Sequence, residues 1–269
     1  MTISSSKSQL ISPEHLQELQ RAKALLENPS LAAKITDYVG TPIELLIDKL
    51  PSNWNQKLGG VTHLALDKAA DAALYTMKDI PGESSSNIWH KVGAATSGAV
   101  GGFFGFAALS VELPISTTLM LRSIADIARE QGEHISNHGT KLACLQVFAL
   151  GGNSKEDDGA ESGYFAIRGM LAQATVEAAE HIAKHGMAKE AAPVIVKFMT
   201  IIAERFGIQI TQKAAAQAIP AIGAIGGAAI NTLFIDHFQD MAKGHFIVRK
   251  LERKYGENAI RQQYKLLPK

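Results

Sequence analysis

The stretch PISTTLMLRSIADIAREQ, residues 114–131, decides the fold class. On a helix of about 3.6 residues per turn, one side of it is apolar and the other is charged. The apolar side holds Leu113, Met120, Leu121, Ile124, Ile127 and Ala128, and the charged side holds Arg122, Asp126, Arg129 and Glu130. The same period recurs through most of the chain, and strand-like alternation is absent except for the ambiguous run 194–196. The sequence therefore predicts an all-α, multi-helical bundle.

Charge and cysteine content exclude several protein classes. The 269 residues carry 27 Lys and Arg against 26 Asp and Glu, for a net charge of +1. Because nucleic-acid binders usually carry a large positive excess, we expect no nucleic-acid partner. The single cysteine, Cys144, cannot form an internal disulfide and lies in an apolar pattern typical of a core residue.

The chain divides at a linker-like run, DIPGESSSN at residues 79–87. We expect a flexible tail at 1–11, an N-terminal helical region at 12–87 and a helical core at 88–269. The first residues lack the apolar run of a secretory signal, so we expect a cytoplasmic protein.

Two segments, 92–111 and 214–235, carry no charged residue. Each has about the 20-residue length that one membrane-spanning helix needs. Their glycines recur at four-residue spacing, which places them on one helix face: Gly98 with Gly102, Gly101 with Gly105, and Gly223 with Gly227. We expect the two segments to form Gly-rich helices that pack against each other. A hairpin buried in protein or lying at a membrane interface is favoured over a permanent span.

Two features adjoin these segments. Five cations crowd into residues 243–254, KGHFIVRKLERK, where they form either a solvated helix face or a contact for anionic headgroups. Glu112 precedes Leu113 and Pro114, and the proline predicts a break or kink at Leu113. Glu112 is then either a capping acid of a helix opened by Pro114 or a functional carboxylate at the bend.

Histidines are the main candidates for chemistry. Glu177, His181 and His185 recur every fourth residue, but the run HIAKH lacks the glutamate of the hydrolytic HExxH motif. His134 and His138 repeat this spacing. We interpret these residues as surface or structural histidines and assign no metal, cofactor or catalytic residue. Phosphate-binding loops and nucleophilic-serine elbows are absent from the sequence.

An ordered series of motifs resembles the EcsC family of bacterial proteins over about residues 92–264. The motifs are GGFFGF, ELPISTTLMLRSIADIAREQGE, KLACLQVFALGG, ESGYFAIRG, IPAIGAIGGAAIN and HF…HFIVRKLERKYG. The family is named after a gene beside those of an ABC-type exporter, so the resemblance implies a membrane-linked role. It implies no established activity or cofactor. It adds weight to these characteristic positions: Leu113, Pro114, Arg122, Asn231, His237 and His245.

Three functions follow as hypotheses, and the sequence leaves open whether the protein is an enzyme. The first is a non-enzymatic protein bound peripherally to the inner face of a membrane, or to a membrane protein, and accessory to an ABC-type transporter or envelope process. The second is a metal-assisted hydrolase that uses Glu112, His237 and His245 in a helical cavity. The third is a soluble helical interaction module.

Overall fold

The computed structural model describes residues 10–27, 30–76, 105–152, 163–185, 193–218 and 223–268, and every regular element in these ranges is helical. The helices are α1 (Pro13–Glu27), α2 (Leu31–Val39), α3 (Ile43–Ile47), α4 (Trp54–Thr76), α6 (Gly105–Glu130), α7 (His138–Gln146), the short 3₁₀ helix η1 (Val147–Ala149), α8 (Gly163–His185), α9 (Pro193–Gln217), α10 (Gly223–Tyr255) and α11 (Glu257–Leu266). The predicted all-α fold is confirmed, and the ambiguous run 194–196 lies in α9.

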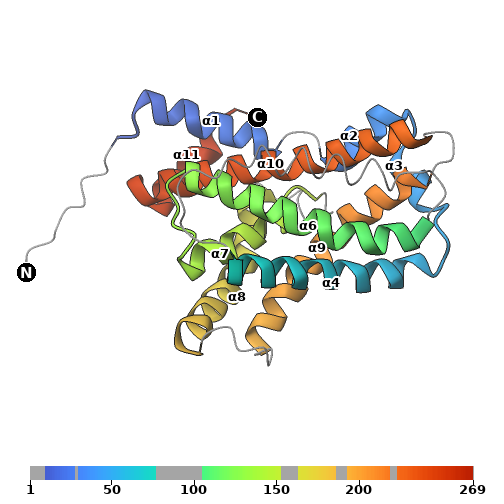
Figure 1. Ribbon diagram of the computed structural model, residues 1–269. Coiled ribbons are helices and arrows are strands. Elements are labelled where there is room, and N and C mark those ends of the chain that lie inside the picture. Colours follow the sequence, from blue (N-terminus) through green and yellow to red (C-terminus); the bar gives the residue numbers. More distant parts are fainter. Residues whose placement is uncertain are drawn as a thin grey trace, which may run out of the picture.

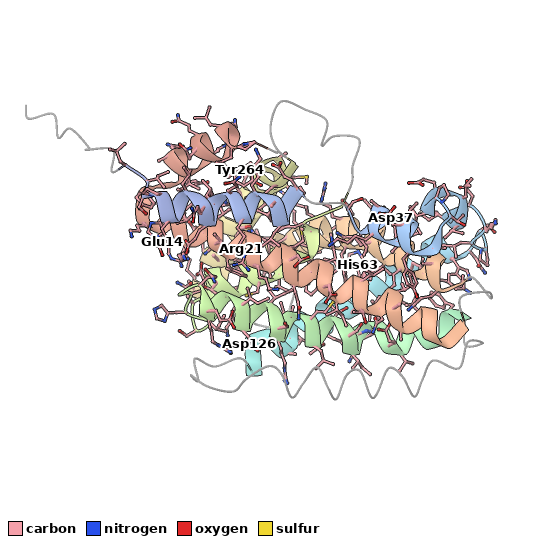
Figure 2. All side chains as sticks on the ribbon, turned by 90° about the horizontal axis from the view of Figure 1, so that it is seen from above. Glu14, Arg21, Asp37, His63, Asp126 and Tyr264 are labelled. Carbon is pink, nitrogen blue, oxygen red and sulfur yellow. The ribbon has the colours of Figure 1, made fainter. Side chains whose placement is uncertain are left out.

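The long helix α10 runs through the molecule, and helices from both halves of the chain pack on it (Figure 1). Seen from above, α1 lies along α10 (Figure 2). On the other side, α6 packs against both α10 and α4, while α9 contacts α4, α8 and α10. Their facing apolar side chains form one continuous core that includes Leu19, Leu113, Phe206 and Phe238.

A glycine permits the close approach of α1 to α10. A Cβ atom at Gly244 would lie 2.6 Å from the Leu26 Cγ and 3.0 Å from the Ala22 carbonyl oxygen. Real Cβ atoms essentially never come as near to another atom as this one would to the Leu26 Cγ, and its distance to the backbone oxygen would be unusually short, so any other residue would force Leu26 or α1 to shift. Such contacts were expected in the Gly-rich segments, and Gly244 lies outside both of them.

Helix α6 continues through Pro114, so it neither breaks at Leu113 nor begins at Pro114, and both of these expectations are wrong. A kink at Leu113 stays a prediction. Leu113 and Pro114 are buried, and α6 packs against α4 on one side and α10 on another. The hydroxyls of Ser116 and Thr118 donate to the carbonyl oxygens of Leu113 and Pro114. Tertiary packing thus holds the helix across a residue that disfavours it locally.

The two uncharged segments differ from the expected pair of helices. Residues 214–235 belong to two helices, because α9 ends at Gln217 and α10 begins at Gly223. Gly98, Gly101 and Gly102 lie outside the described residues, while Gly105, Gly223 and Gly227 lie at the amino ends of α6 and α10. The close packing of the two Gly-rich segments against each other therefore stays a prediction. Among the helices that the structure describes, none combines the length and the apolar character needed to cross a bilayer.

Candidate functional site on the buried face of α9

Three polar side chains form a stripe on the buried face of α9. Arg205, Gln209 and Lys213 follow one another at four-residue spacing, so they lie on one side of the helix. Gln209 and Lys213 are fully buried, and Arg205 is 8 % exposed. Burying such polar groups costs free energy unless each one finds a hydrogen-bond or ion-pair partner inside the protein.

Lys213 forms an ion pair with Glu112 of α6. Its Nζ lies 3.0 Å from each carboxylate oxygen of Glu112, and it also lies 4.7 Å from the ring centre of Phe234 on α10. The Glu112 side chain keeps 20 % of its surface exposed, whereas the Lys213 side chain is fully enclosed. Glu112 therefore does not cap a helix that begins at Pro114. It is the counter-ion of a buried lysine.

Arg205 and Gln209 hold the turn that follows η1. The Arg205 guanidinium donates to the carbonyl oxygens of Ala149 and Gly152, at 3.0 and 3.4 Å. The Gln209 amide nitrogen donates to the Leu150 carbonyl oxygen at 2.6 Å. These bonds satisfy backbone acceptors at the last residue of η1 and just beyond it, so the polar stripe fixes the path of the chain at residues 149–152.

His237 of α10 packs against the same turn. Gly151 has a φ angle of +74°, and a Cβ atom there would lie only 2.5 Å from the His237 Nε2 and 2.8 Å from the Met241 sulfur. His237 is 1 % exposed, and neither ring nitrogen has a hydrogen-bond partner in the described part of the chain. Burial, helped by the charge of Lys34, lowers the pKa of His237 to about 3, so the imidazole is neutral.

His245, two turns further along α10, belongs to a different buried network. Its Nδ1 lies 3.0 Å from the Tyr164 hydroxyl, which also accepts a hydrogen bond from Arg168. Arg168 in turn binds both carboxylate oxygens of Glu252. Burial, followed by the charges of Arg168 and Arg249, lowers the pKa of His245 well below its ordinary value. This network joins α8 to α10.

The two remaining candidates lie at separate places. Asn231 of α10 is 8 % exposed, and its side-chain oxygen has no hydrogen-bond partner within the described residues. Arg122 is half-buried on α6. Burial raises the pKa of the Asp126 carboxyl, and the charges of Arg129 and Arg122 oppose this rise. Asp126 forms an ion pair with Arg129, three residues further along α6.

The candidates for metal-assisted hydrolysis do not converge. His237 and His245 are eight residues apart on α10, which separates them by about 12 Å along the helix axis. Glu112 is occupied by Lys213. No group of three or more potential metal ligands occurs in the ranges that the structure describes. The hydrolase hypothesis therefore has no assembled site among these residues.

Most cations of the basic stretch at 243–254 are engaged within the protein. Arg249 and Arg253 both bind Glu133, and Lys250 binds Glu18 at 2.8 Å. Burial opposes ionisation of Glu133, but the hydrogen bonds and charges of the two arginines outweigh it and lower the pKa of this carboxyl. The stretch thus anchors α10 to its neighbours and offers fewer free charges than the sequence suggests.

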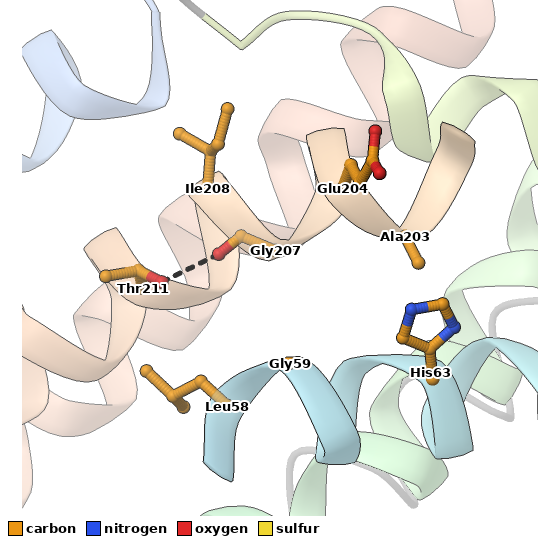
Figure 3. Close-up of a pocket in the computed structure, with 8 residues that line it drawn as sticks. All are labelled: Leu58, Gly59, His63, Ala203, Glu204, Gly207, Ile208 and Thr211. Atoms are coloured by element: carbon orange, nitrogen blue, oxygen red, sulfur yellow. Dashed lines mark hydrogen bonds between the residues drawn. The ribbon is translucent and has the colours of Figure 1, made fainter. Parts of the chain in front are cut away.

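A groove of about 300 Å³ lies between α4 and α9, on the face of α9 opposite the polar stripe (Figure 3). Gly59 and Gly207 line the groove, so no side chain fills it at these two positions. A Cβ atom at either glycine would meet nothing within 4 Å. His63 and Glu204 supply its ionisable groups. Among the described residues, this groove is a shallow, mainly apolar surface with two ionisable side chains, His63 and Glu204.

Sequence reasoning singled out Glu112 and His237 but missed the side chains that face them. Arg205, Gln209 and Lys213 recur every fourth residue in the run FMTIIAERFGIQITQKAAAQ, and this spacing was a readable signal of a polar stripe. Cys144 is buried as expected, and burial raises the pKa of its thiol to about 12, which makes it a poor nucleophile.

Comparisons with known proteins give one match. Neither the curated proteins nor the solved structures yield a similar chain. Among protein families, the model of the EcsC protein family matches residues 13–251, which include α1 to α9 and nearly all of α10. The polar stripe, the turn at 149–152 and both buried histidines all lie within this match. The chain therefore belongs to the EcsC protein family.

Proposed function

We propose that this protein acts without catalysis at the cytoplasmic face of a membrane, and that one face of α6 is the contact surface. The observation that carries the proposal is a row of apolar side chains on successive turns, here called the α6 face: Val111, Ile115 and Leu119. Val111 is 66 % exposed and Ile115 is 54 % exposed, and Leu119 is half-buried. Exposed apolar side chains that adjoin one another are typical of interaction surfaces.

The charge distribution supports a membrane contact at this face. Between Gly105 and Leu121 the sole charged residue of α6 is Glu112, and its carboxylate binds Lys213 in the interior. The α6 face also continues, in sequence, the uncharged run that begins at residue 92. An apolar helix face without charges can lie at the boundary between headgroups and acyl chains at little electrostatic cost.

Membership of the EcsC family supports a role at a membrane. The EcsC family is named after a gene that lies beside the genes of an ABC-type exporter, so assistance to a transporter or to another envelope process fits a protein bound at the inner membrane surface. Arg249 and Arg253 both bind Glu133, so they are less available to attract anionic headgroups. We therefore expect apolar contact to be the main source of membrane binding.

Co-sedimentation with phospholipid vesicles tests the proposal. We expect the native protein to pellet with zwitterionic vesicles, and the variant Val111→Glu/Ile115→Glu to remain in the supernatant. Val176→Glu is the matched control, because Val176 is 58 % exposed and belongs to α8, not to α6. It should pellet like the native protein.

Two results would contradict the proposal. Failure of the native protein to bind any vesicle would favour the soluble interaction module. Binding to native membrane vesicles but not to pure lipid would assign the α6 face to a membrane protein instead of the lipid surface.

A further inference from the structure

Two imidazoles, the half-buried His181 and the exposed His185, lie side by side at the carboxyl end of α8. His181 and His185 are one turn apart, their ring centres are 4.6 Å from each other, and their planes are inclined by 28°. They are far from the α6 face and from the buried stripe, because α8 and α9 extend away from the body of the molecule at this end (Figure 1). We infer that this pair binds a divalent transition-metal ion such as Zn²⁺ or Ni²⁺.

A contact with the backbone determines which ring nitrogen of His185 keeps its lone pair. The His185 Nδ1 lies 3.3 Å from the backbone carbonyl oxygen of His181. Since a carbonyl oxygen can only accept, Nδ1 carries the proton and donates, and Nε2 keeps its lone pair for a metal. A hydrogen bond from the second ring nitrogen to a carbonyl is the usual support of a metal-binding histidine.

The surroundings favour a cation. α8 ends at His185, so its unsatisfied carbonyl groups give this end of the helix a partial negative charge. Glu177 lies one turn before His181, and Lys184, the nearest cation in sequence, is 3.7 Å from Glu180. His185 is exposed and His181 is half-buried, so neither ring is sealed from solvent and an ion can reach both.

The pair supplies two of the ligands that such an ion takes. Zn²⁺ is usually four-coordinate, so two positions remain for water or for an incoming ligand. This agrees with the absence of any cluster of three or more ligating residues in the described ranges. The site is therefore an open, exchangeable one and not a structural zinc site.

The chain contains a matched control with the same spacing. His134 and His138 are also four residues apart, but α7 begins at His138 and His134 lies in the turn before it. The two rings are therefore not placed on successive turns of one helix. They should not bind an ion together, although the two pairs look alike in the sequence.

Titration calorimetry of the full-length protein with Zn²⁺ alone tests the inference. We expect one ion per chain, and we expect His181→Ala and His185→Ala each to weaken binding by at least about tenfold, the effect of losing even a supporting contact of a metal ligand. His134→Ala/His138→Ala should bind like the native protein. In addition, Zn²⁺ should raise the Tm of the native protein and not that of the two α8 variants.

The inference is overturned if the native protein binds no Zn²⁺, or if both α8 variants bind it as the native protein does. A loss confined to the His134→Ala/His138→Ala variant would overturn it as well, because the ion would then lie near α7.

Discussion

The Nζ of Lys213 lies 3.0 Å from each carboxylate oxygen of Glu112, yet water reaches only one partner of this ion pair. The lysine side chain is fully buried, and the carboxylate side chain keeps 20 % of its surface exposed. The pair joins α6 to α9 directly before Pro114, where the α6 backbone lacks a donor. Because the two ends differ in exposure, the two ways of breaking the pair should differ in cost.

We predict that Glu112→Gln is more destabilising than Lys213→Met. The first change strands a buried ammonium group, which costs about 3–5 kcal/mol when a buried pair is broken. The second leaves a carboxylate that water can solvate, and it adds an apolar side chain beside Phe234. Urea unfolding of both variants measures the difference in the free energy of unfolding.

The double variant Glu112→Gln/Lys213→Met is the control for this prediction. It removes both charges, so it should be more stable than Glu112→Gln alone, with a favourable coupling energy in the double-mutant cycle. Equal losses in the two single variants, with no coupling, would show that the ion pair does not hold α6 against α9.

A second prediction concerns the turn at Gly151. Replacing Gly151 by Ala adds two costs, the strain of a φ angle of +74° and a Cβ atom 2.5 Å from the His237 ring. Gly40 has nearly the same φ angle, +72°, and open space around its Cβ position. Gly40→Ala should therefore cost only the left-handed strain, about 1–2 kcal/mol, and Gly151→Ala should cost clearly more.

The comparison separates steric from backbone effects. In a His237→Ala background the clash with the ring is removed and only the contact with the flexible Met241 side chain remains, so the cost of Gly151→Ala should fall toward that of Gly40→Ala when both are measured by urea unfolding. An unchanged cost would mean that the imidazole does not press on the turn.

The local sequence pattern predicted the helical character of this fold well. It failed where contacts between residues far apart in the sequence determine the structure. The apolar side of residues 113–128 is buried as expected, because helical periodicity is a local property. The break at Leu113 did not occur, because packing on α4 and α10 overrides the local effect of Pro114. The close contact at Gly244 depends on Leu26, more than 200 residues away, which no local pattern shows.

The same limit applies to the site. Glu112 and His237 stood out because a charge or an imidazole in an apolar run is conspicuous in sequence. Their roles depend on partners that only the folded chain brings together, Lys213 at a separation of 101 residues and Gly151 on a turn between two helices. The four-residue spacing of Arg205, Gln209 and Lys213 could have placed them on one helix face. It could not have indicated what that face contacts.

The last prediction is a loss of stability in mild acid that depends on the buried histidines. The pKa of His237 is lowered from 6.5 to about 3, and that of His245 is also lowered well below 6.5. The unfolded chain therefore binds protons below pH 6.5 that the folded chain cannot bind, so the folded state loses stability as the pH falls from 6.5 toward the folded pKa.

Each histidine should contribute a slope of up to about 1.4 kcal/mol per pH unit in this window, and none above it. Urea unfolding between about pH 7.5 and about pH 5 measures this slope while most carboxyl groups stay ionised. His237→Gln removes one titrating group, so the slope of this variant should be smaller than that of the native protein by about one proton. An identical slope in both proteins would mean that His237 can take up a proton without unfolding, and that the ring is not sealed between Gly151 and Met241 as the geometry requires.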